Sequence, residues 1–252
     1  MPIKKIIPCM DIKNGRVVKG TKFENIEDVA NPVEMAKYYM ETGADVLIFY
    51  DIAASAEDKP IFYDLIKKVK AEITIPYVVG GGIQTIEDAD RVMDCGADKI
   101  SINSGVIKRP EFLAEVARKY GSPAIIFSMD VRMVDGIYRV FSNAGTTNTG
   151  IDALEWTKQG VENGAGELVI NSIDTDGAKC GYDIEMLERI SSLSNTPIIA
   201  SGGAGIPEDF YEALKIKNVE SALAARVFHY KEINIRDLKQ YLKKKGIEVL
   251  VN

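Results

Sequence analysis

Two aspartates stand at related places in the sequence and carry the groups that acid–base chemistry needs. Asp11 ends the apolar segment 5–11, and Asp130 ends a similar segment, 124–130, which lies 119 positions further along the chain. Two carboxyl groups can divide proton transfer when their surroundings separate their pKa values, so that one donates a proton while the other accepts one. The pair therefore predicts general acid–base catalysis on a molecule held between them.

A duplicated glycine turn predicts two sites for anions. Five residues of the first turn recur in the second at a constant offset of 121 positions: Pro76, Gly81, Gly82, Glu87 and Asp88 correspond to Pro197, Gly202, Gly203, Glu208 and Asp209. Glycines between a strand and a helix let the backbone approach an anion closely, and the helix that follows directs free N–H groups at it. The glycines could instead serve only to make tight turns, but their duplication favours a ligand with a phosphate at each end.

The residues that follow the next strands add polar groups to both turns. Asn103 and Ser104 follow the strand after the first turn, and Ala225 and Arg226 follow the strand after the second. Phosphate sites after the last two strands are frequent in α/β barrels. The repeat thus predicts a second phosphate site opposite the first.

The segment 13–28, which follows Asp11, is long and polar. A carboxylate at a strand end often only caps the next helix, but this segment separates Asp11 from the first predicted helix. We expect the segment to be a loop that closes as a lid, with Lys19 reaching a phosphate when it closes.

Eight short apolar segments are predicted to be the strands that position these side chains. They span residues 5–11, 46–52, 75–81, 98–103, 124–130, 167–173, 196–202 and 221–227. Between them lie stretches with helical spacing of apolar residues, such as Val33, Ala36 and Met40. Continuous apolar strands are typical of a parallel sheet covered on both faces. The alternation predicts an α/β fold, a (β/α)8 TIM barrel, with a doubly wound open sheet as the alternative.

The repeat divides this predicted barrel into two parts. Residues 1–252 are expected to form a single barrel domain built from two pseudo-symmetric half-barrels, roughly 1–120 and 121–245. The offset maps the first strand onto the fifth, the third onto the seventh and the fourth onto the eighth. Such pairs face each other across a closed barrel, so Asp11 and Asp130 are expected on opposite walls, between the two anion sites.

The composition excludes several classes of protein. A net charge of −6 and a pI near 5.1 argue against a nucleic-acid binder, and the absence of any run of about 18 apolar residues argues against a membrane protein. The three cysteines form no C-x-x-C pair, which argues against disulfides and zinc and favours the cytoplasm. The single histidine, His229, is expected to pack or cap, so neither a metal nor a cofactor is expected.

Seven motifs, spread from residue 6 to residue 233, together resemble one enzyme family. They are IIPCMDIKNGRVVKG, VGGGIQ, DKISIN, MDVR, GAGELVINSIDTDGAKCGYD, PIIASGGAG and ALAARVFHYKEI. The chain is similar over its whole length to the cyclase subunit of imidazole glycerol phosphate synthase, from histidine biosynthesis. The resemblance implies a barrel that binds the bisphosphorylated phosphoribulosyl-formimino-aminoimidazole carboxamide ribonucleotide and adds ammonia. It would then release imidazole glycerol phosphate and aminoimidazole carboxamide ribonucleotide.

The resemblance also implies roles for residues at matching positions. Asp11 and Asp130 would be the acid–base pair. The substrate- and phosphate-binding positions would be Lys19, Asp51, Gly82, Asn103, Ser104, Asp176, Gly177, Ser201, Gly203 and Arg226. Ammonia is expected from a glutaminase (class I amidotransferase) subunit that forms a heterodimer at the opposite face of the barrel. Lys5, Lys99 and Glu167 would mark the ammonia entrance.

Four positions depart from the pattern of that family. Val46 stands where Glu is expected, Lys5 where Arg is expected, Arg226 where Ser is expected, and Asn171 where Thr is usual. These departures affect the entrance, one phosphate site and the polar lining after the sixth strand.

Three alternatives to the cyclase stay open. One is the related phosphoribosyl sugar isomerase of the same pathway, which needs no ammonia. Another is a divergent amidotransferase-partner barrel of surface-sugar biosynthesis, and a third is a barrel that only binds or scaffolds its partner. The retained Asp11 favours the histidine-pathway reaction over the surface-sugar one, and Cys9 and Lys19 in the first motif, together with VFHYKEI, favour the cyclase over the isomerase.

Overall fold

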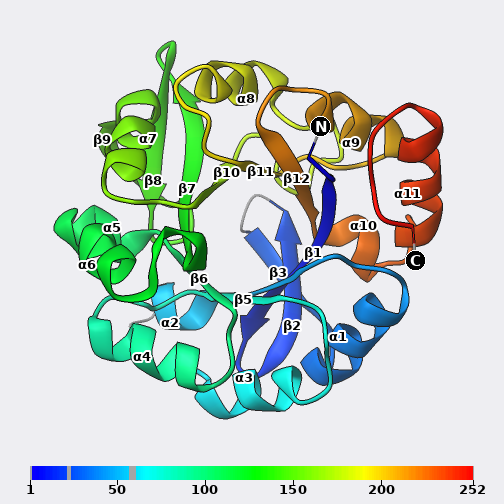
Figure 1. The fold of residues 1–252 in the computed structure, drawn as a ribbon, viewed down its shortest axis with the longest axis horizontal. Coiled ribbons are helices and arrows are strands. Elements are labelled where there is room, and N and C mark those ends of the chain that lie inside the picture. Colours follow the sequence, from blue (N-terminus) through cyan, green and yellow to red (C-terminus); the bar gives the residue numbers. More distant parts are fainter. Residues whose placement is uncertain (1, 22–23, 57–60, 252) are drawn as a thin grey trace.

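Eight parallel strands close into a barrel in the computed structural model, which describes residues 2–21, 24–56 and 61–251 (Figure 1). In order around the barrel they are β1 (Lys5–Lys13), β4 (Leu47–Asp51), β5 (Tyr77–Gly80), β6 (Lys99–Ile102), β7 (Ile125–Val134), β10 (Glu167–Ser172), β11 (Ile198–Ser201) and β12 (Val219–Ala224). Strand β12 pairs with β1, with Lys5 opposite Ser221. This closure confirms the (β/α)8 barrel and excludes the open sheet.

Helices surround the barrel as an outer ring (Figure 1). The longer ones are α1 (Pro32–Glu41), α3 (Tyr63–Lys70), α4 (Ile86–Asp94), α6 (Glu111–Tyr120), α7 (Ala153–Glu162), α8 (Ile184–Ser191), α9 (Pro207–Leu214) and α11 (Ile235–Lys244). Shorter helical segments are α2 (Ile52–Ala56), α5 (Ser104–Lys108), η1 (Ser122–Ala124) and α10 (Arg226–His229). Helices α1 and α7 begin alike, because Asn31 and Asp152, 121 positions apart, each accept two backbone N–H groups of the first turn.

Two apolar layers hold the fold together. The larger one fills the space between the outer faces of the strands and the helices. The smaller one fills the barrel interior and consists of Ile7, Cys9, Val46, Ile48, Val78, Ile126, Val169, Ile199 and Leu223. The inward positions that follow this interior layer towards the carboxyl ends of the strands include Asp11, Asp130 and Asn171. The change from apolar to polar side chains therefore marks the mouth of the barrel.

The segment after Asp11 is not the loop that the sequence predicted. It forms two further strands, β2 (Arg16–Thr21) and β3 (Glu24–Ala30), in an antiparallel extension of β1. The second half has the same device, in which β8 (Ile137–Ser142) and β9 (Thr147–Asp152) extend β7. Each hairpin turn places an Asn-Gly or Asp-Gly pair at positive φ, Asn14-Gly15 in the first half and Asp135-Gly136 in the second. Such pairs are strong hairpin signals, and they are also 121 positions apart.

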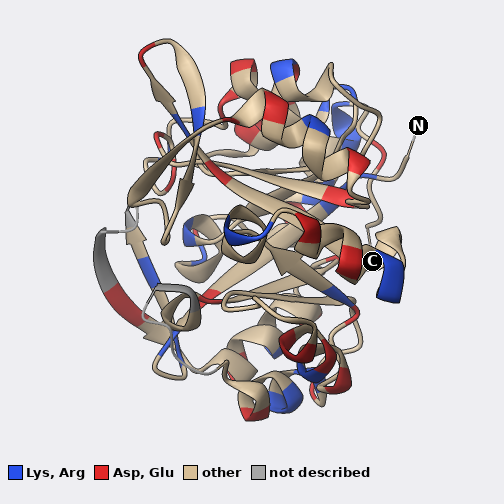
Figure 2. Ribbon diagram, turned by 90° about the vertical axis from the view of Figure 1, so that its left-hand side faces the viewer, with Lys and Arg blue, Asp and Glu red and all other residues tan. Residues whose placement is uncertain are grey.

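The two antiparallel extensions project from one end of the barrel, and both chain termini lie towards the other end (Figure 2). At the terminal end, Lys4 and Val249 form a parallel bridge. Lys243 and Lys244 occupy the last turn of α11, and Lys245 follows as its C-cap, close to where the sequence placed this basic run. The element order of 5–120 recurs in 125–244 except for α2, which has no counterpart among the described residues between β10 and α8, and this order is consistent with the proposed half-barrels.

Candidate active site

One pocket at the carboxyl ends of the barrel strands contains both aspartates and both glycine turns. Every substrate-site residue expected from the sequence lines it: Asp11, Lys19, Asp51, Gly82, Asn103, Ser104, Asp130, Asp176, Gly177, Ser201, Gly203 and Arg226. Strands β1 and β7 are separated by three strands on either side, so Asp11 and Asp130 lie on opposite walls of the pocket. The expected juxtaposition is therefore present.

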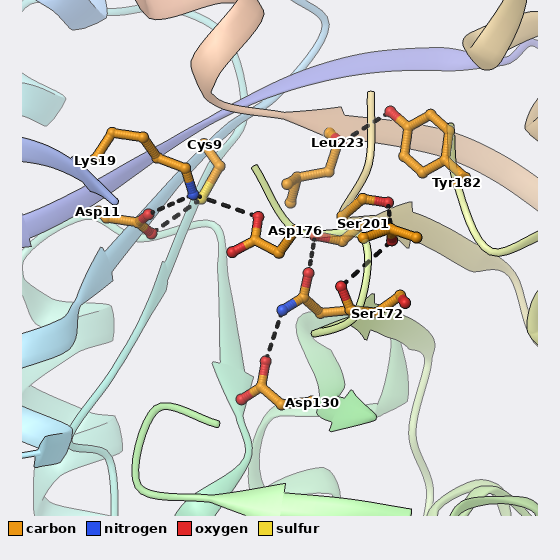
Figure 3. Close-up of polar contacts among 12 residues, drawn as sticks. Cys9, Asp11, Lys19, Asp130, Ser172, Asp176, Tyr182, Ser201 and Leu223 are labelled. Atoms are coloured by element: carbon orange, nitrogen blue, oxygen red, sulfur yellow. Dashed lines mark hydrogen bonds and ion pairs between the residues drawn. The ribbon is translucent and has the colours of Figure 1, made fainter. Parts of the chain in front are cut away.

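On the first wall, Asp11 faces a buried cation (Figure 3). Lys19, on β2, is only 9% exposed, and its Nζ lies 3.4 Å from Asp11 Oδ2 and 3.5 Å from Asp176 Oδ1. Burial acts to lower the pKa of Lys19, but the two carboxylates outweigh it and raise that pKa above its ordinary value. The sequence led us to expect Lys19 to reach a phosphate from a mobile loop, whereas the structure places it on a strand between two carboxylates.

Two neighbours of this ion pair also have altered pKa values. Burial raises the pKa of Asp176 above its ordinary value, against the opposing effect of Lys19. Cys9 Sγ lies 3.8 Å from Asp11 Oδ1, and burial raises the pKa of this thiol well above its usual range. Cys9 is therefore a protonated donor to Asp11 rather than a thiolate.

On the second wall, neutral amides surround Asp130. Asn171 Nδ2 donates to Asp130 Oδ1 at 2.9 Å, and Asn103 Nδ2 donates to Asp130 Oδ2 at 3.0 Å. Burial raises the pKa of Asp130 to about 6, against the opposing effect of these amide hydrogen bonds. This carboxyl group therefore changes its protonation closer to neutral pH than an ordinary aspartate does.

The glycine turns require glycine for steric reasons. Gly82 and Gly203 have φ values of +72° and +111°. A Cβ at Gly203 would meet Gly181 O at 1.9 Å, and one at Gly82 would meet Ala54 Cβ at 2.6 Å. The turns pack closely against neighbouring loops while their backbone lines the pocket.

The helices that follow these turns are each capped by an acidic residue of their own first turn. Asp88 Oδ2 accepts the N–H groups of Gln84 and Thr85 before α4. Asp209 Oδ2 accepts those of Gly205 and Ile206 before α9 in the same way. These N–H groups are occupied and are not offered to an anion. The repeated acidic residue of the two turns is thus a helix cap.

Short helices begin beside both turns and bring the other expected residues to the pocket. Asn103 is the N-cap of α5 and Ala225 that of α10, so that Ser104 and Arg226 are the first residues of these helices. The Arg226 guanidinium also stacks over the ring of Tyr230, with Cζ 5.6 Å from the ring centroid.

Two other residues serve the structure around the pocket. Asp51 lines the pocket, but its carboxylate is fully buried and accepts the N–H groups of Ala54 and Phe62 at 2.9 and 3.1 Å. His229 is buried on α10 and hydrogen-bonds through Nδ1 to the hydroxyl of Tyr39. Burial lowers the pKa of His229 to about 4, so it packs as a neutral ring, as the sequence suggested.

The entrance residues lie at the other end of the barrel strands. Lys99, at the start of β6, pairs with Glu167, at the start of β10, at an Nζ–Oε1 distance of 2.5 Å. Lys5, at the start of β1, is partly buried. Val46 belongs to the apolar interior layer, which separates these charges from the mouth.

Sequence analysis missed Tyr50 as a pocket residue and did not assign Asn171 to the site. Both line the pocket, and Tyr50 Oη lies 3.0 Å from Ser101 Oγ. Tyr50 pairs in register with Asp11, and Asn171 pairs with Asp130. The two-residue period of a strand, counted forward from the interior residues Ile48 and Val169, places both side chains inside.

Comparison with known proteins identifies the family. A family model described as "Histidine biosynthesis protein" matches residues 5–234. Imidazole glycerol phosphate synthase subunit HisF from Oceanobacillus iheyensis is 51% identical over 100% of this chain and 99% of its own length. The chain belongs to the HisF family. HisF proteins from Natranaerobius thermophilus and a Thermotoga species are 45% and 47% identical over 99% of this chain, and over 99% and 98% of their own lengths.

Membership of the HisF family confirms the resemblance, and with it the cyclase subunit of imidazole glycerol phosphate synthase. In the part of the chain that the structure describes, no group of three or more His, Cys, Asp or Glu side chains is placed to hold a metal ion. No helix within the same described residues is long and apolar enough to cross a membrane.

Proposed function

We propose that Asp11 and Asp130 are the acid–base pair with which this HisF protein closes an imidazole ring with ammonia. One observation carries the proposal: the two carboxyl groups lie on opposite walls of a single pocket, between two glycine turns related by the repeat. The substrate implied by the family is the bisphosphorylated phosphoribulosyl-formimino-aminoimidazole carboxamide ribonucleotide. A molecule with a phosphate at each end spans such a pocket with its reacting carbon atoms between the two acids.

The surroundings of the two carboxyl groups favour different roles. Asp130, with a pKa raised to about 6, is the proton donor to the oxygen or nitrogen that leaves. Asp11 lies beside the Lys19 ammonium group and is the proton acceptor from the attacking nitrogen. Two bound phosphates bring further negative charge, which raises the pKa of Asp130 in the complex and helps it to hold its proton.

The phosphates are assigned to the two halves of the mouth. Gly82, Asn103 and Ser104 hold one of them, and Gly177 and Gly203 hold the other, together with the start of α10. Arg226, the first residue of α10, supplies a cation where the family has a hydroxyl group, and a guanidinium group can bind a phosphate through two hydrogen bonds.

Ammonia is proposed to come from a glutaminase subunit that binds the end of the barrel opposite the mouth. The Lys99–Glu167 ion pair and Lys5 lie at that end, and the apolar interior layer leads from there to the pocket. We place the complex in the cytoplasm, where the cysteines stay reduced. In a test with the purified glutaminase subunit, glutamine should support turnover and the two chains should co-elute from a sizing column. Failure of both would reject the partner assignment.

The catalytic roles are tested by turnover with ammonium salts, which needs no partner. Asp11→Asn and Asp130→Asn should each lower kcat by about 10²- to 10⁴-fold, since each removes a general acid or base. Asp135→Asn is the matched control, because Asp135 lies in the β7–β8 turn and the β1–β2 turn has Asn at the same place. This change should leave kcat unchanged. Near-normal rates in either pocket variant would reject the assigned roles. Conversion of the isomerase substrate without ammonia would favour the isomerase instead.

A further inference from the structure

A chain of three hydrogen bonds ties Asp130 to the strands on both sides of it. Ser201 Oγ, on β11, donates to Asn171 Oδ1, on β10, at 2.9 Å. Asn171 Nδ2 in turn donates to Asp130 Oδ1 on β7, and Asn103 Nδ2, after β6, donates to Asp130 Oδ2. Each oxygen of the carboxylate thus accepts one amide hydrogen, which fixes the plane of the carboxylate across the barrel wall. Figure 3 shows the part of this chain that runs from Ser201 to Asp130.

The orientation of the Asn171 amide is determined by its two partners. Its oxygen accepts from a hydroxyl group, and its NH2 group faces a carboxylate, which can only accept when it is ionised. The reversed amide would point its oxygen at the ionised Asp130 carboxylate, which has no proton to donate, and would lose the hydrogen bond to Asp130. Gly202 also leaves room for this arrangement, because a Cβ there would meet Asn171 Oδ1 at 3.0 Å. The local backbone therefore leaves room for the Asn171 side chain, and the ionised carboxylate sets its orientation.

The first half of the barrel provides an internal comparison. Asn171 and Ser201 correspond at the offset of 121 to Tyr50 and Gly80, and the register is the same in both halves. Tyr50 packs its ring against Gly80 and directs its hydroxyl at Ser101, and not at the neighbouring Asp11. The same two positions thus hold an aromatic ring in one half and a hydrogen-bond relay in the other.

We propose that Asn171 is a positioning residue, which, oriented by Ser201, holds the Asp130 carboxyl group in one plane and stabilises its ionised form. The inference deepens the proposed function and rests on it for its catalytic meaning. Burial and the carboxylates of Asp176 and Asp11 all raise the pKa of Asp130. Without the Asn171 donor, only the Asn103 hydrogen bond would oppose them, and Asp130 would hold its proton up to higher pH.

The test follows the titration of the Asp130 carboxyl carbon by ¹³C NMR in the intact chain, assigned by its absence in Asp130→Asn. In Asn171→Leu, which keeps the size but loses the amide, the pKa of Asp130 should rise by about one to two units, the effect of one hydrogen bond to a charged group. Asn171→Thr restores a hydroxyl donor and should recover part of the shift. Ser201→Ala, which only releases the Asn171 amide, should give a smaller rise in the same direction.

A change at the equivalent position of the other half separates this role from general loosening of the pocket. Tyr50→Phe should leave the titration of Asp130 within about 0.3 units, because Tyr50 is not one of its hydrogen-bond donors. An unchanged titration in both Asn171→Leu and Ser201→Ala would overturn the proposal. If Asn171→Leu does not fold, Ser201→Ala decides alone, and an unchanged titration of Asp130 in that variant overturns the proposal.

The activity assay distinguishes this proposal from the proposed function. If the titration moves as expected but the unmodified chain shows no ammonia-dependent turnover, the positioning role stands and the proposed function fails. If the unmodified chain turns over with ammonium salts but the titration of Asp130 does not move in the variants, the proposed function stands and the positioning role fails. When both succeed, the pH profile of kcat/KM with ammonium salts should shift upward in Asn171→Leu by the same amount as the NMR titration.

Discussion

The two walls of the pocket share a backbone plan and differ in electrostatics. On both walls an aspartate on a barrel strand precedes a hairpin turn of the same type, and a glycine turn lies two strands further round the barrel. Asp11 faces the ammonium group of Lys19, whereas Asp130 faces two neutral amides. The repeated backbone plan thus fixes where the carboxyl groups lie, and the different neighbouring side chains make them chemically different. Two acids in identical surroundings would not divide proton donation from acceptance.

The strongest test of this difference is to remove the cation from the first wall. Lys19→Met leaves Asp11 and Asp176 without their shared partner, and we expect kcat/KM with ammonium salts to fall by at least about 100-fold, as for the loss of one catalytic electrostatic partner. Arg16→Met, on the same strand, removes an exposed ion pair with Asp28 and should leave turnover unchanged. A loss of less than tenfold in kcat/KM for Lys19→Met would mean that the Lys19 cation is not what makes Asp11 differ in its role from Asp130.

The second test uses the pH dependence of stability on the second wall. The pKa of Asp130 is raised from 3.8 to about 6 on folding, so the folded state binds this proton more tightly than the unfolded state does. Asp130 therefore destabilises the fold as pH rises from about 4 to 6, and the loss amounts to about 3 kcal/mol at higher pH. Asp130→Asn should be more stable than the parent chain at pH 8 and lose most of that advantage at pH 4, measured by urea unfolding. Parallel pH curves for the two proteins would contradict the raised pKa.

The third test compares the two glycine turns. At Gly203 an added Cβ meets a backbone oxygen at 1.9 Å, with φ at +111°, whereas at Gly82 it meets a side-chain methyl at 2.6 Å, with φ at +72°. Gly203→Ala should therefore lower the free energy of unfolding by about 3 kcal/mol, and Gly82→Ala by about 2 kcal/mol. Gly15→Ala, where an added Cβ would meet nothing within 4 Å, measures the cost of the positive φ alone. Equal losses at the two turns would show that their packing is equivalent.

Much of this architecture could be predicted from residue patterns. The apolar strands, the offset of 121 and the polar residues at strand ends led to the barrel, the two aspartates and the two glycine turns. The resemblance to the family alone added Asp51, Asp176, Gly177 and Ser201. The length and polarity of 13–28 predict a loop, so the hairpins are not predicted. The pairs Asn14-Gly15 and Asp135-Gly136 are nevertheless signals for turns between strands. Charge and polarity alone do not distinguish an exposed strand pair from a lid.

The partners of each site residue could not be predicted, because they depend on how neighbouring strands align. Register places Asn171 beside Asp130, and a shift of one residue would turn its side chain out of the barrel. Asp51, which the resemblance placed at the mouth, lines the pocket, and its oxygens accept the N–H groups of Ala54 and Phe62. Sequence patterns identified the residue types at the mouth, but not which groups their polar atoms would meet.

The smallest expected difference between the halves concerns the caps of α4 and α9. Asp88→Ala and Asp209→Ala each remove a carboxylate that accepts two N–H groups, which costs about 1 kcal/mol in the free energy of unfolding. The loss should be larger at Asp209, whose hydrogen bonds are shorter, both 2.8 Å against 3.0 and 3.1 Å. In addition, Thr85 still caps α4 through its hydroxyl oxygen, while Ile206 at the same place before α9 has no polar side-chain atom. Urea unfolding of both single variants and of the double variant Thr85→Val/Asp88→Ala checks this. The double variant lacks both caps of α4, so its free energy of unfolding should fall at least as far as that of Asp209→Ala. A larger loss at Asp88 alone would show that the two turns are not held by equivalent caps.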